Sequence, residues 1–384
     1  MTPKNRRYGF GAALLLLAGA AAWIEWADKK YVYKAMYHNF ASIDDHKIFK
    51  QRKIKSPRKK QPWPKAAKYN QLQMPASLQR VHQRLQSVAF LIVQNDAILH
   101  EQYWRGYSEA SKTSSFSMAK SIVSMLVGVA IKEGKIKSVE QRVGDFLPEF
   151  RHGDKARITI KDLLWMSSGL NWDESYINPF SKTTEAYYGD NLKKVVDRLE
   201  TVTPSGEAFS YKSGDTQLLG FVLRAATGKS LSQYAQEKLW KPLGAAHDAE
   251  WSIDRIGGME KAYCCFFSNA RDFARLGKLY LHNGIWNGET IVPPAYVKGS
   301  LTPSGLPAAD NGETVNFYGY HWWLLPNYKG QDIFYARGIL GQYIIVIPEK
   351  NLIIVRLGKK RGNFLNRHPY EVMTIIDAVN EMVP

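Results

Sequence analysis

Hydrophobic runs at the two ends of the chain predict β-strands. Residues 87–108, SVAFLIVQNDAILHEQYWRGYS, fit two strands joined at the turn-prone Gln94-Asn95-Asp96. Near the C-terminus, four more runs of β-branched and aromatic residues predict successive strands, at 318–325, 332–338, 341–348 and 351–358. The segment 369–383 then predicts a closing helix.

The middle of the chain predicts helices instead. From about 134 to 256 the pattern is mainly helical, with one helix expected to end at Gly169 and two helices expected to meet at Gly228. Another amphipathic helix is expected over 270–284. Strands, a long helical middle and strands again predict an α+β fold. In it, an antiparallel sheet is built from both chain ends and flanked by helices, with a mostly helical lobe inserted.

The N-terminal region predicts export. KNRR precedes a stretch of about 16 mostly apolar residues that ends at Ala20-Ala21-Ala22. Residues 1–27 fit either a cleaved signal peptide or an uncleaved membrane anchor, with Trp23 and Trp26 as interfacial residues. In both cases we expect a periplasmic protein or one anchored to the inner membrane.

The positive charge is concentrated before the predicted domain. The chain carries a formal net charge of +17, and residues 1–70 hold 16 lysines and arginines against 4 acidic residues. This distribution argues against a nucleic-acid-binding domain, whose basic surface belongs to its folded part. We interpret 28–76, with its four prolines, as a basic connector, either solvated or in contact with a membrane or other anionic surface. The globular domain is expected over 77–384.

Cysteine and metal chemistry are not indicated. Cys264 and Cys265 are adjacent, and we interpret both as buried small hydrophobic residues because neighbouring cysteines rarely form an unstrained disulfide. The sequence contains no H-E-x-x-H pair and no G-x-S-x-G motif. No metal site and no cofactor are therefore expected.

Ser117 and Lys120 head the apolar run of Ser114 to Ile136, SSFSMAKSIVSMLVGVAIKEGKI. Residues three apart share a helix face, and a serine hydroxyl becomes a strong nucleophile only beside a base. A largely neutral, desolvated lysine supplies one, and the helix N-terminus offers a free N–H to an oxyanion. The S-x-x-K spacing alone is weak, because Ser56-Pro57-Arg58-Lys59 repeats it by chance. Taken alone, Ser117 also fits a helix cap.

Two later features fit the same chemistry. Tyr211-Lys212-Ser213 lies between a turn and a helix, where a phenol near a lysine serves as a proton shuttle. A partly buried aromatic is the alternative. Gly338 and Gly341 precede an apolar strand and suggest a close backbone approach that supplies a second oxyanion N–H, or else a simple hairpin.

In this order, the three features resemble the serine β-lactamase and penicillin-binding-protein superfamily. Tyr211 makes the chain similar to class C β-lactamases and related esterases. Four longer stretches resemble the 6-aminohexanoate-dimer hydrolase branch: SFSMAKSIVSMLVGVAIKEGKI, ITIKDLLWMSSGLNWDE, FSYKSGDTQLLG and ARDFARLGKLYLHNGIWNGE. The resemblance spans about 85–384 and implies a β-lactamase/transpeptidase-like fold.

The resemblance implies a role for each site residue. Ser117 would be acylated, Lys120 would be its general base, and Tyr211 would pass protons to the leaving group. The N–H groups of Ser117 and Ile339 would form the oxyanion hole. Further substrate contacts are expected from the following side chains: Tyr176, Tyr188, Asp190, Arg337 and Gln342.

The chain departs from the class C pattern at the third motif. Ala336-Arg337-Gly338 stands where Lys-Thr-Gly is expected, so a substrate carboxylate loses its lysine unless Arg337 replaces it. We therefore expect an exported serine hydrolase acting on a small amide or ester. The alternatives are a peptidoglycan D,D-carboxypeptidase, a β-lactamase, and a non-catalytic cell-wall-binding member of the fold.

Overall fold

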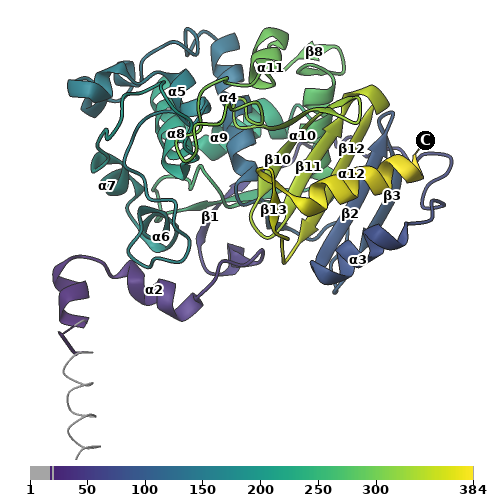
Figure 1. Cartoon of the computed structure of the whole chain (residues 1–384), viewed down its shortest axis with the longest axis horizontal. Helices are drawn as coiled ribbons and strands as arrows, with labels where there is room; N and C mark the ends of the chain where they lie inside the picture. The colour runs from purple at the N-terminus through teal and green to yellow at the C-terminus, as the bar shows by residue number, and fades with distance from the viewer. Residues whose placement is uncertain (1–17, 20, 384) are drawn as a thin grey trace, which may run out of the picture.

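A six-stranded antiparallel sheet joins the two ends of the chain in the computed structural model, which describes residues 18–19 and 21–383 (Figure 1). The strand order is β3-β2-β12-β11-β10-β9. The bounds are β2 Ser87–Gln94, β3 Ala97–Tyr103, β9 Trp323–Tyr328, β10 Gln331–Gly338, β11 Gln342–Ile347 and β12 Leu352–Gly358. The pairing of β2 with β12 confirms the prediction of a sheet assembled from both chain ends.

Both faces of this sheet are covered by helices. Alternate residues of β2 enter two different cores: Leu91 and Val93 pack on one side, Phe90 and Ile92 on the other. Helices α3 (Ala76–Arg84) and α12 (Tyr370–Met382) share the second core, while α10 (Ala270–Leu281) contacts β2, β11 and β12. Two-sided burial explains why these strands are continuous apolar runs in the sequence.

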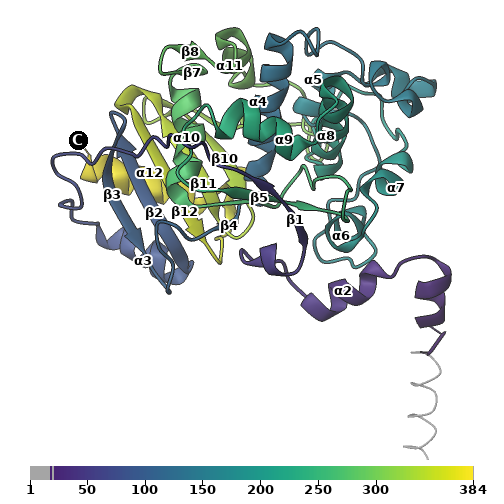
Figure 2. The same ribbon diagram turned by 180° about the vertical axis from the view of Figure 1, so that it is seen from behind.

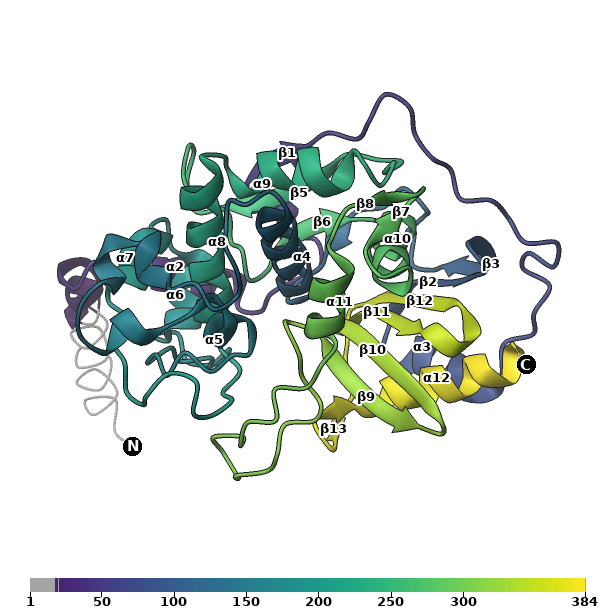
Figure 3. The ribbon, with the colours of Figure 1, turned by 90° about the horizontal axis from the view of Figure 1, so that it is seen from above.

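A helical lobe lies beside the sheet, as predicted. Its elements are η2 Val143–Asp145, η3 Pro148–Phe150, η4 Gly153–Arg157, α5 Ile160–Leu164, α6 Lys182–Tyr188, α7 Leu192–Asp197, α8 Ser213–Thr227, α9 Leu231–Ala235 and η5 Gln236–Trp240. Helix α8 ends at Gly228, which adopts a left-handed φ of 67°, as expected at a helix stop. The helix expected to end at Gly169 was predicted too long, because α5 stops at Leu164. Helix α4 (Met118–Lys132) packs against α8 between the lobe and the sheet (Figure 3).

The sequence prediction missed a second, four-stranded sheet. Its order is β1-β5-β6-β4, with bounds β1 Lys50–Ile54, β4 Thr113–Ser114, β5 Ala249–Ile253 and β6 Phe266–Ser268. Strand β5 lies within the segment predicted to be helical, so the lobe contains a strand near its end. Strand β4 stops three residues before Ser117 and thereby fixes the approach to α4. Smaller elements complete the chain: α2 Tyr31–His38, η1 Asp45–Lys47, β7 Ile285–Trp286, β8 Glu289–Thr290, α11 Pro294–Ser300, η6 Pro348–Lys350, β13 Phe364–Leu365 and β14 His368–Pro369.

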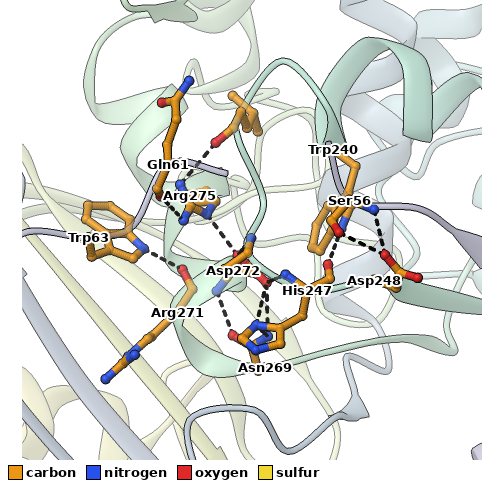
Figure 4. A network of polar contacts seen from close by, with 12 residues as sticks. Ser56, Gln61, Trp63, Trp240, His247, Asp248, Asn269, Arg271, Asp272 and Arg275 are labelled. Atoms are coloured by element: carbon orange, nitrogen blue, oxygen red, sulfur yellow. Dashed lines mark hydrogen bonds and ion pairs between the residues drawn. The ribbon is translucent and has the colours of Figure 1, made fainter. Parts of the chain in front are cut away.

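The segment 28–76 is folded onto the body, which corrects its interpretation as a solvated connector. Strand β1 pairs antiparallel with β5, and Figure 2 shows it crossing the back of the molecule. The following residues are held by polar contacts that Figure 4 shows from close by. The indole N–H of Trp63 donates to the carbonyl oxygen of Arg271 at 2.8 Å, and the N–H of Ser56 donates to Asp248 Oδ1 at 2.8 Å.

The predicted signal peptide or anchor, residues 1–27, falls largely outside the described residues. Of the helices in the part of the chain that the structure describes, none has the length and apolar character needed to cross a membrane.

Candidate active site

Ser117 stands immediately before α4, and its side chain makes no capping hydrogen bond. Its Oγ lies 3.1 Å from Lys120 Nζ instead. The helix-cap alternative therefore finds no support in the geometry. Phe116, just before it, is buried and has a left-handed φ of 44°, a conformation that costs a non-glycine residue on the order of 1 kcal/mol or more. Ser117 thus follows a strained turn.

Lys120 is the centre of the polar cluster. Its side chain is buried, and Nζ donates to Ser213 Oγ and to the carbonyl oxygen of Tyr263, each at 3.1 Å. The apolar residues that follow it on α4 create this desolvated setting, as the sequence predicted. Three oxygens from three separate segments therefore fix the position of one amine.

Tyr211, two residues before α8, approaches the same amine. Lys120 Nζ lies 5.0 Å from the centroid of the Tyr211 ring. The ring packs against Tyr318 and Trp323, at centroid distances of 6.1 and 5.7 Å. The structure thus brings together Ser117, Lys120 and Tyr211, the three residues that the sequence singled out.

Sequence reasoning assigned no role to Ser213 or Glu174. Glu174 accepts hydrogen bonds from the Ser213 N–H at 2.6 Å, the Ser213 hydroxyl at 2.7 Å and the Tyr176 hydroxyl at 2.6 Å. A chain of hydrogen bonds therefore runs from Tyr176 through Glu174 and Ser213 to Lys120. The acidic residues of the NWDESY stretch were the only signal for Glu174 in the sequence.

A cavity of about 160 Å³ opens beside Ser117. Its walls are mostly apolar and aromatic: Phe40, Ala41, Phe116, Tyr176, Tyr187, Tyr188, Tyr263, Cys264, Ile339 and Leu340, with Asn39, Thr183, Thr184 and Ser213 as further lining residues. Predicted contacts Tyr176 and Tyr188, and the proposed oxyanion residue Ile339, are among them. Residues 39–41, from the segment predicted to be a connector, form part of the wall.

Three predicted substrate contacts lie outside this cavity. Gln342 is buried, and its amide donates to the carbonyl oxygens of Gly358 at 2.7 Å and Ile339 at 3.1 Å, so it braces the hairpin. The Asp190 carbonyl oxygen, just after the C-terminal end of α6, accepts from the Arg255 guanidinium at 2.7 Å.

Arg337 is the third of these residues. Its guanidinium lies 3.2 Å from the centroid of the Trp323 ring and donates to the carbonyl oxygen of Arg367 at 2.9 Å. Trp323 in turn packs against Tyr211. Arg337 and Tyr211 therefore both pack against Trp323, and Arg337 does not line the cavity.

Gly338 and Gly341 combine a hairpin with a close backbone approach. Strands β10 and β11 form a hairpin, and Gly341 in its turn has a φ of 82°. Gly338 permits the close approach, because a Cβ there would lie 2.2 Å from the Ser115 carbonyl oxygen. Strand β9 pairs with β10 only as far as Tyr335, so the end of β10 is left free to face the segment before Ser117.

The two cysteines form a disulfide, which corrects their interpretation as independent hydrophobic residues. Both are buried, as expected, and Cys265 has a left-handed φ of 65°. Cys264 lines the cavity and directly follows Tyr263, whose carbonyl oxygen accepts from Lys120. Its own carbonyl oxygen accepts from the Trp251 indole at 2.9 Å. The eight-membered disulfide ring therefore adjoins one of the three oxygens that hold the lysine.

Replacing Cys264 and Cys265 together by alanine is expected to lower kcat by about 10- to 100-fold, because a shift of about 1 Å at the Tyr263 carbonyl misplaces Lys120. The measurement is kcat for ester hydrolysis, with the melting temperature recorded alongside. Reductant should slow the wild-type protein similarly and leave the double variant unaffected. A double variant with wild-type kcat would show that the ring does not position the lysine.

Burial controls the protonation of two groups behind the site. It raises the pKa of Asp215, a buried residue of α8 that accepts from Ser168 Oγ at 2.6 Å, to about 7. Burial lowers the pKa of His321, which contacts Thr216 Oγ1 at 3.0 Å, to about 3. His321 is therefore neutral at physiological pH.

Within residues 18–19 and 21–383, the His, Cys, Asp and Glu side chains form no group of three or more that could hold a metal ion.

The family model described as Beta-lactamase matches residues 73–373. The chain belongs to the β-lactamase family. A 6-aminohexanoate-dimer hydrolase of Paenarthrobacter ureafaciens is 27% identical to it over 297 residues, which cover 72% of this chain and 74% of that protein. This β-lactamase-family chain is accordingly a serine hydrolase.

Solved structures confirm the fold. A Bacillus anthracis protein described as a 6-aminohexanoate-dimer hydrolase superposes with a TM-score of 0.75, at 22% identity, over 89% of this chain and 91% of that one. A family VIII carboxylesterase superposes with a TM-score of 0.62, at 18% identity, over 79% of this chain and 95% of that one. The expected β-lactamase/transpeptidase-like α+β fold is therefore correct.

Proposed function

We propose that this serine hydrolase cleaves a small amide or ester through an acyl-enzyme on Ser117. The observation that carries the proposal is the position of Lys120 Nζ, which lies 3.1 Å from Ser117 Oγ and is held by two further oxygens. To accept the Ser117 proton, the amine has to present its lone pair to Ser117 Oγ. In that form, Ser213 Oγ and the Tyr263 carbonyl oxygen are the acceptors for its two N–H bonds.

The acylation step follows from this arrangement. The Ser117 hydroxyl proton passes to Lys120 Nζ as Oγ bonds to the substrate carbonyl carbon. The negative charge on the carbonyl oxygen is stabilised by the N–H groups of Ser117 and Ile339. The carbon–nitrogen or carbon–oxygen bond then breaks, and a proton from Lys120, relayed by Tyr211, neutralises the leaving group.

Deacylation returns the enzyme to its starting state. A water oxygen attacks the acyl carbon while its proton passes to Tyr211, which gives its own phenolic proton to Lys120. The bond from that carbon to Ser117 Oγ breaks, and Oγ regains its proton from the lysine. No cofactor enters either half of the cycle.

The lining of the cavity favours a substrate with an apolar group. Aromatic side chains dominate its lining, and Arg337, the candidate replacement for the third-motif lysine, is held against Trp323. Among the described residues that line the cavity there is no lysine or arginine, so its wall offers no cationic side chain to a substrate carboxylate. This favours a linear amide or ester with no carboxylate close to the scissile bond over a β-lactam, whose carboxylate lies beside it. The relative from Paenarthrobacter ureafaciens is named for the 6-aminohexanoate dimer, itself a linear amide.

A panel of four substrates tests this specificity: p-nitrophenyl butyrate, a linear 6-aminohexanoate dimer, nitrocefin and a peptide ending in D-Ala-D-Ala. We expect turnover of the ester or the linear amide to exceed that of nitrocefin by at least about 100-fold in kcat/KM, because the site lacks the lysine that would bind a β-lactam carboxylate. Efficient nitrocefin hydrolysis would favour a β-lactamase instead. Release of D-alanine would favour a D,D-carboxypeptidase.

We also propose that the protein functions outside the cytoplasm. The support is the sequence of residues 1–27, in which a charged stretch precedes an apolar one. Whether this segment is cleaved as a signal peptide or kept as an anchor, we would expect the active site on the exported side.

A further inference from the structure

Large apolar side chains of the N-terminal segment are exposed to an unusual degree. Trp26 is 84% exposed, Met36 71%, Tyr37 85% and Phe40 73%. These residues belong to a structured part of the chain, because Ile24, Tyr31, Val32 and Ala35 are buried and α2 packs against α6. One side of the segment is therefore used to hold it in place, while the other presents aromatic side chains to the outside.

A loop of the helical lobe extends the same surface. Ile177 is 90% exposed and Phe180 44% exposed. The Trp23 and Phe180 rings contact each other edge to face at 5.5 Å, and Lys29 Nζ lies 5.2 and 5.3 Å from their centroids. We call this surface the aromatic rim, defined by Trp23, Trp26, Tyr33, Met36, Tyr37, Phe40, Tyr176, Ile177 and Phe180.

The aromatic rim borders the active site. Phe40 and Tyr176 belong to the rim and also line the cavity beside Ser117. Whatever covers the rim therefore lies next to the entrance of that cavity.

The chemistry of the rim fits a phospholipid bilayer. Tryptophan and tyrosine prefer the headgroup level of a membrane, where their rings are apolar and their polar atoms remain hydrated. Lys29 and the exposed Lys34 provide cations for lipid phosphates. Chain connectivity adds a second argument, because the apolar stretch that ends at Ala22 immediately precedes Trp23. If that stretch is an anchor, Trp23 and Trp26 lie at the membrane boundary, and if it is cleaved, they begin the mature chain.

We propose that the aromatic rim docks on the surface of a phospholipid bilayer and opens the Ser117 cavity toward it. The substrate class that follows is an amphiphilic ester or amide presented from the membrane, and this second part rests on the proposed function. Docking by the rim is distinct from tethering by residues upstream of it, since tethering alone leaves Met36 in water.

A polarity-sensitive fluorophore distinguishes docking from tethering. The full chain carrying Met36→Cys is labelled with NBD and reconstituted with phosphatidylcholine–phosphatidylglycerol vesicles; the native cysteines are buried in their disulfide. The control label is at Glu289→Cys in β8, exposed on the side of the molecule away from α2 (Figures 1 and 2). We expect a blue shift and increased emission at position 36 and no change at position 289.

Two results would overturn the docking proposal. One is an unchanged spectrum at position 36 while the protein pellets with the vesicles, which would mean tethering alone. The other is a blue shift that appears without vesicles and grows with protein concentration, which would assign the rim to a second copy of the chain.

The substrate part is tested with Trp26→Ser/Tyr37→Ser, which changes two rim residues that do not line the cavity. We expect kcat/KM for soluble p-nitrophenyl acetate to stay unchanged and the rate on a vesicle-borne ester to fall by about tenfold or more, since less apolar area reaches the lipid. Val202→Ser, at a position 64% exposed outside the rim, is the matched control and should leave both rates unchanged. If the double variant hydrolysed the vesicle-borne ester at the wild-type rate, an amphiphilic substrate presented from the membrane would be contradicted. If the wild-type protein showed no esterase activity at all, the proposed function would be refuted. The NBD fluorescence experiment would still test docking, because it does not depend on catalysis.

Discussion

Ser117→Ala is expected to lower kcat for a p-nitrophenyl ester by about 10⁴- to 10⁶-fold, the loss typical of removing a serine nucleophile from its catalytic unit. Without Oγ no acyl-enzyme forms, and only binding and the oxyanion N–H groups remain. The variant should retain the fold, because the Ser117 side chain is no helix cap and α4 gains its stability from its buried apolar residues. The measurements are steady-state hydrolysis and a thermal melt.

The chance S-x-x-K copy at Ser56 supplies a matched control. Ser56 also precedes a lysine by three residues, but its hydroxyl donates to Asp248 Oδ1 at 2.9 Å near the surface. Ser56→Ala should therefore keep wild-type kcat. A folded Ser117→Ala protein with more than a few per cent of wild-type activity would contradict the assignment of the nucleophile.

Lys120→Met is expected to lower kcat by about 10²- to 10⁴-fold, the range for loss of a general base. Methionine has a similar length, so the change removes the amine with little loss of packing. The acyl-enzyme should form more slowly in pre-steady-state measurements, because Ser117 then lacks a base to accept its proton.

Lys261→Met is the matched control for removing a buried lysine. Burial lowers the pKa of Lys261 to about 7, and its amine donates to the carbonyl oxygens of Ala186 and Tyr187 at 2.8 Å each. These contacts hold the end of α6, so we expect Lys261→Met to affect KM or stability while Ser117 still becomes acylated. If the Lys120 variant kept wild-type acylation kinetics, another group would have to be the base.

The sequence predicted the main sheet because its strands are buried on both faces. Residues 352–358, LIIVRLG, are all buried. They form an almost continuous apolar run, whereas a strand with one face in water would alternate apolar and polar residues. Strand β1 has the opposite character: its residues, KQRKI, are mostly polar and only Ile54 is buried. It forms a strand because it pairs with β5, some 200 residues later in the chain. The local sequence pattern of residues 50–54 does not reveal that distant contact.

Some residues of the candidate site could likewise be predicted from local sequence, and others could not. Ser117 and Lys120 share one helix turn, so their proximity follows from local geometry. The motif order identified Tyr211. Tertiary packing alone brings the Tyr263 carbonyl to the lysine and Glu174 to Ser213. Asp190 and Gln342 lie close in sequence to residues that line the cavity, but their own contacts are with Arg255 and the β10–β11 hairpin. The disulfide was missed because backbone conformation, here the left-handed φ of Cys265, decides whether adjacent cysteines bond.

Covalent labelling of the folded protein tests the central claim most directly. The full chain is treated with a fluorophosphonate, and the adduct is located by intact-mass analysis and peptide mapping. We predict a single adduct on Ser117, strongly slowed labelling of Lys120→Met and none of Ser117→Ala. A folded wild-type protein that gains no adduct, or gains it on another residue, would contradict an acyl-enzyme on Ser117.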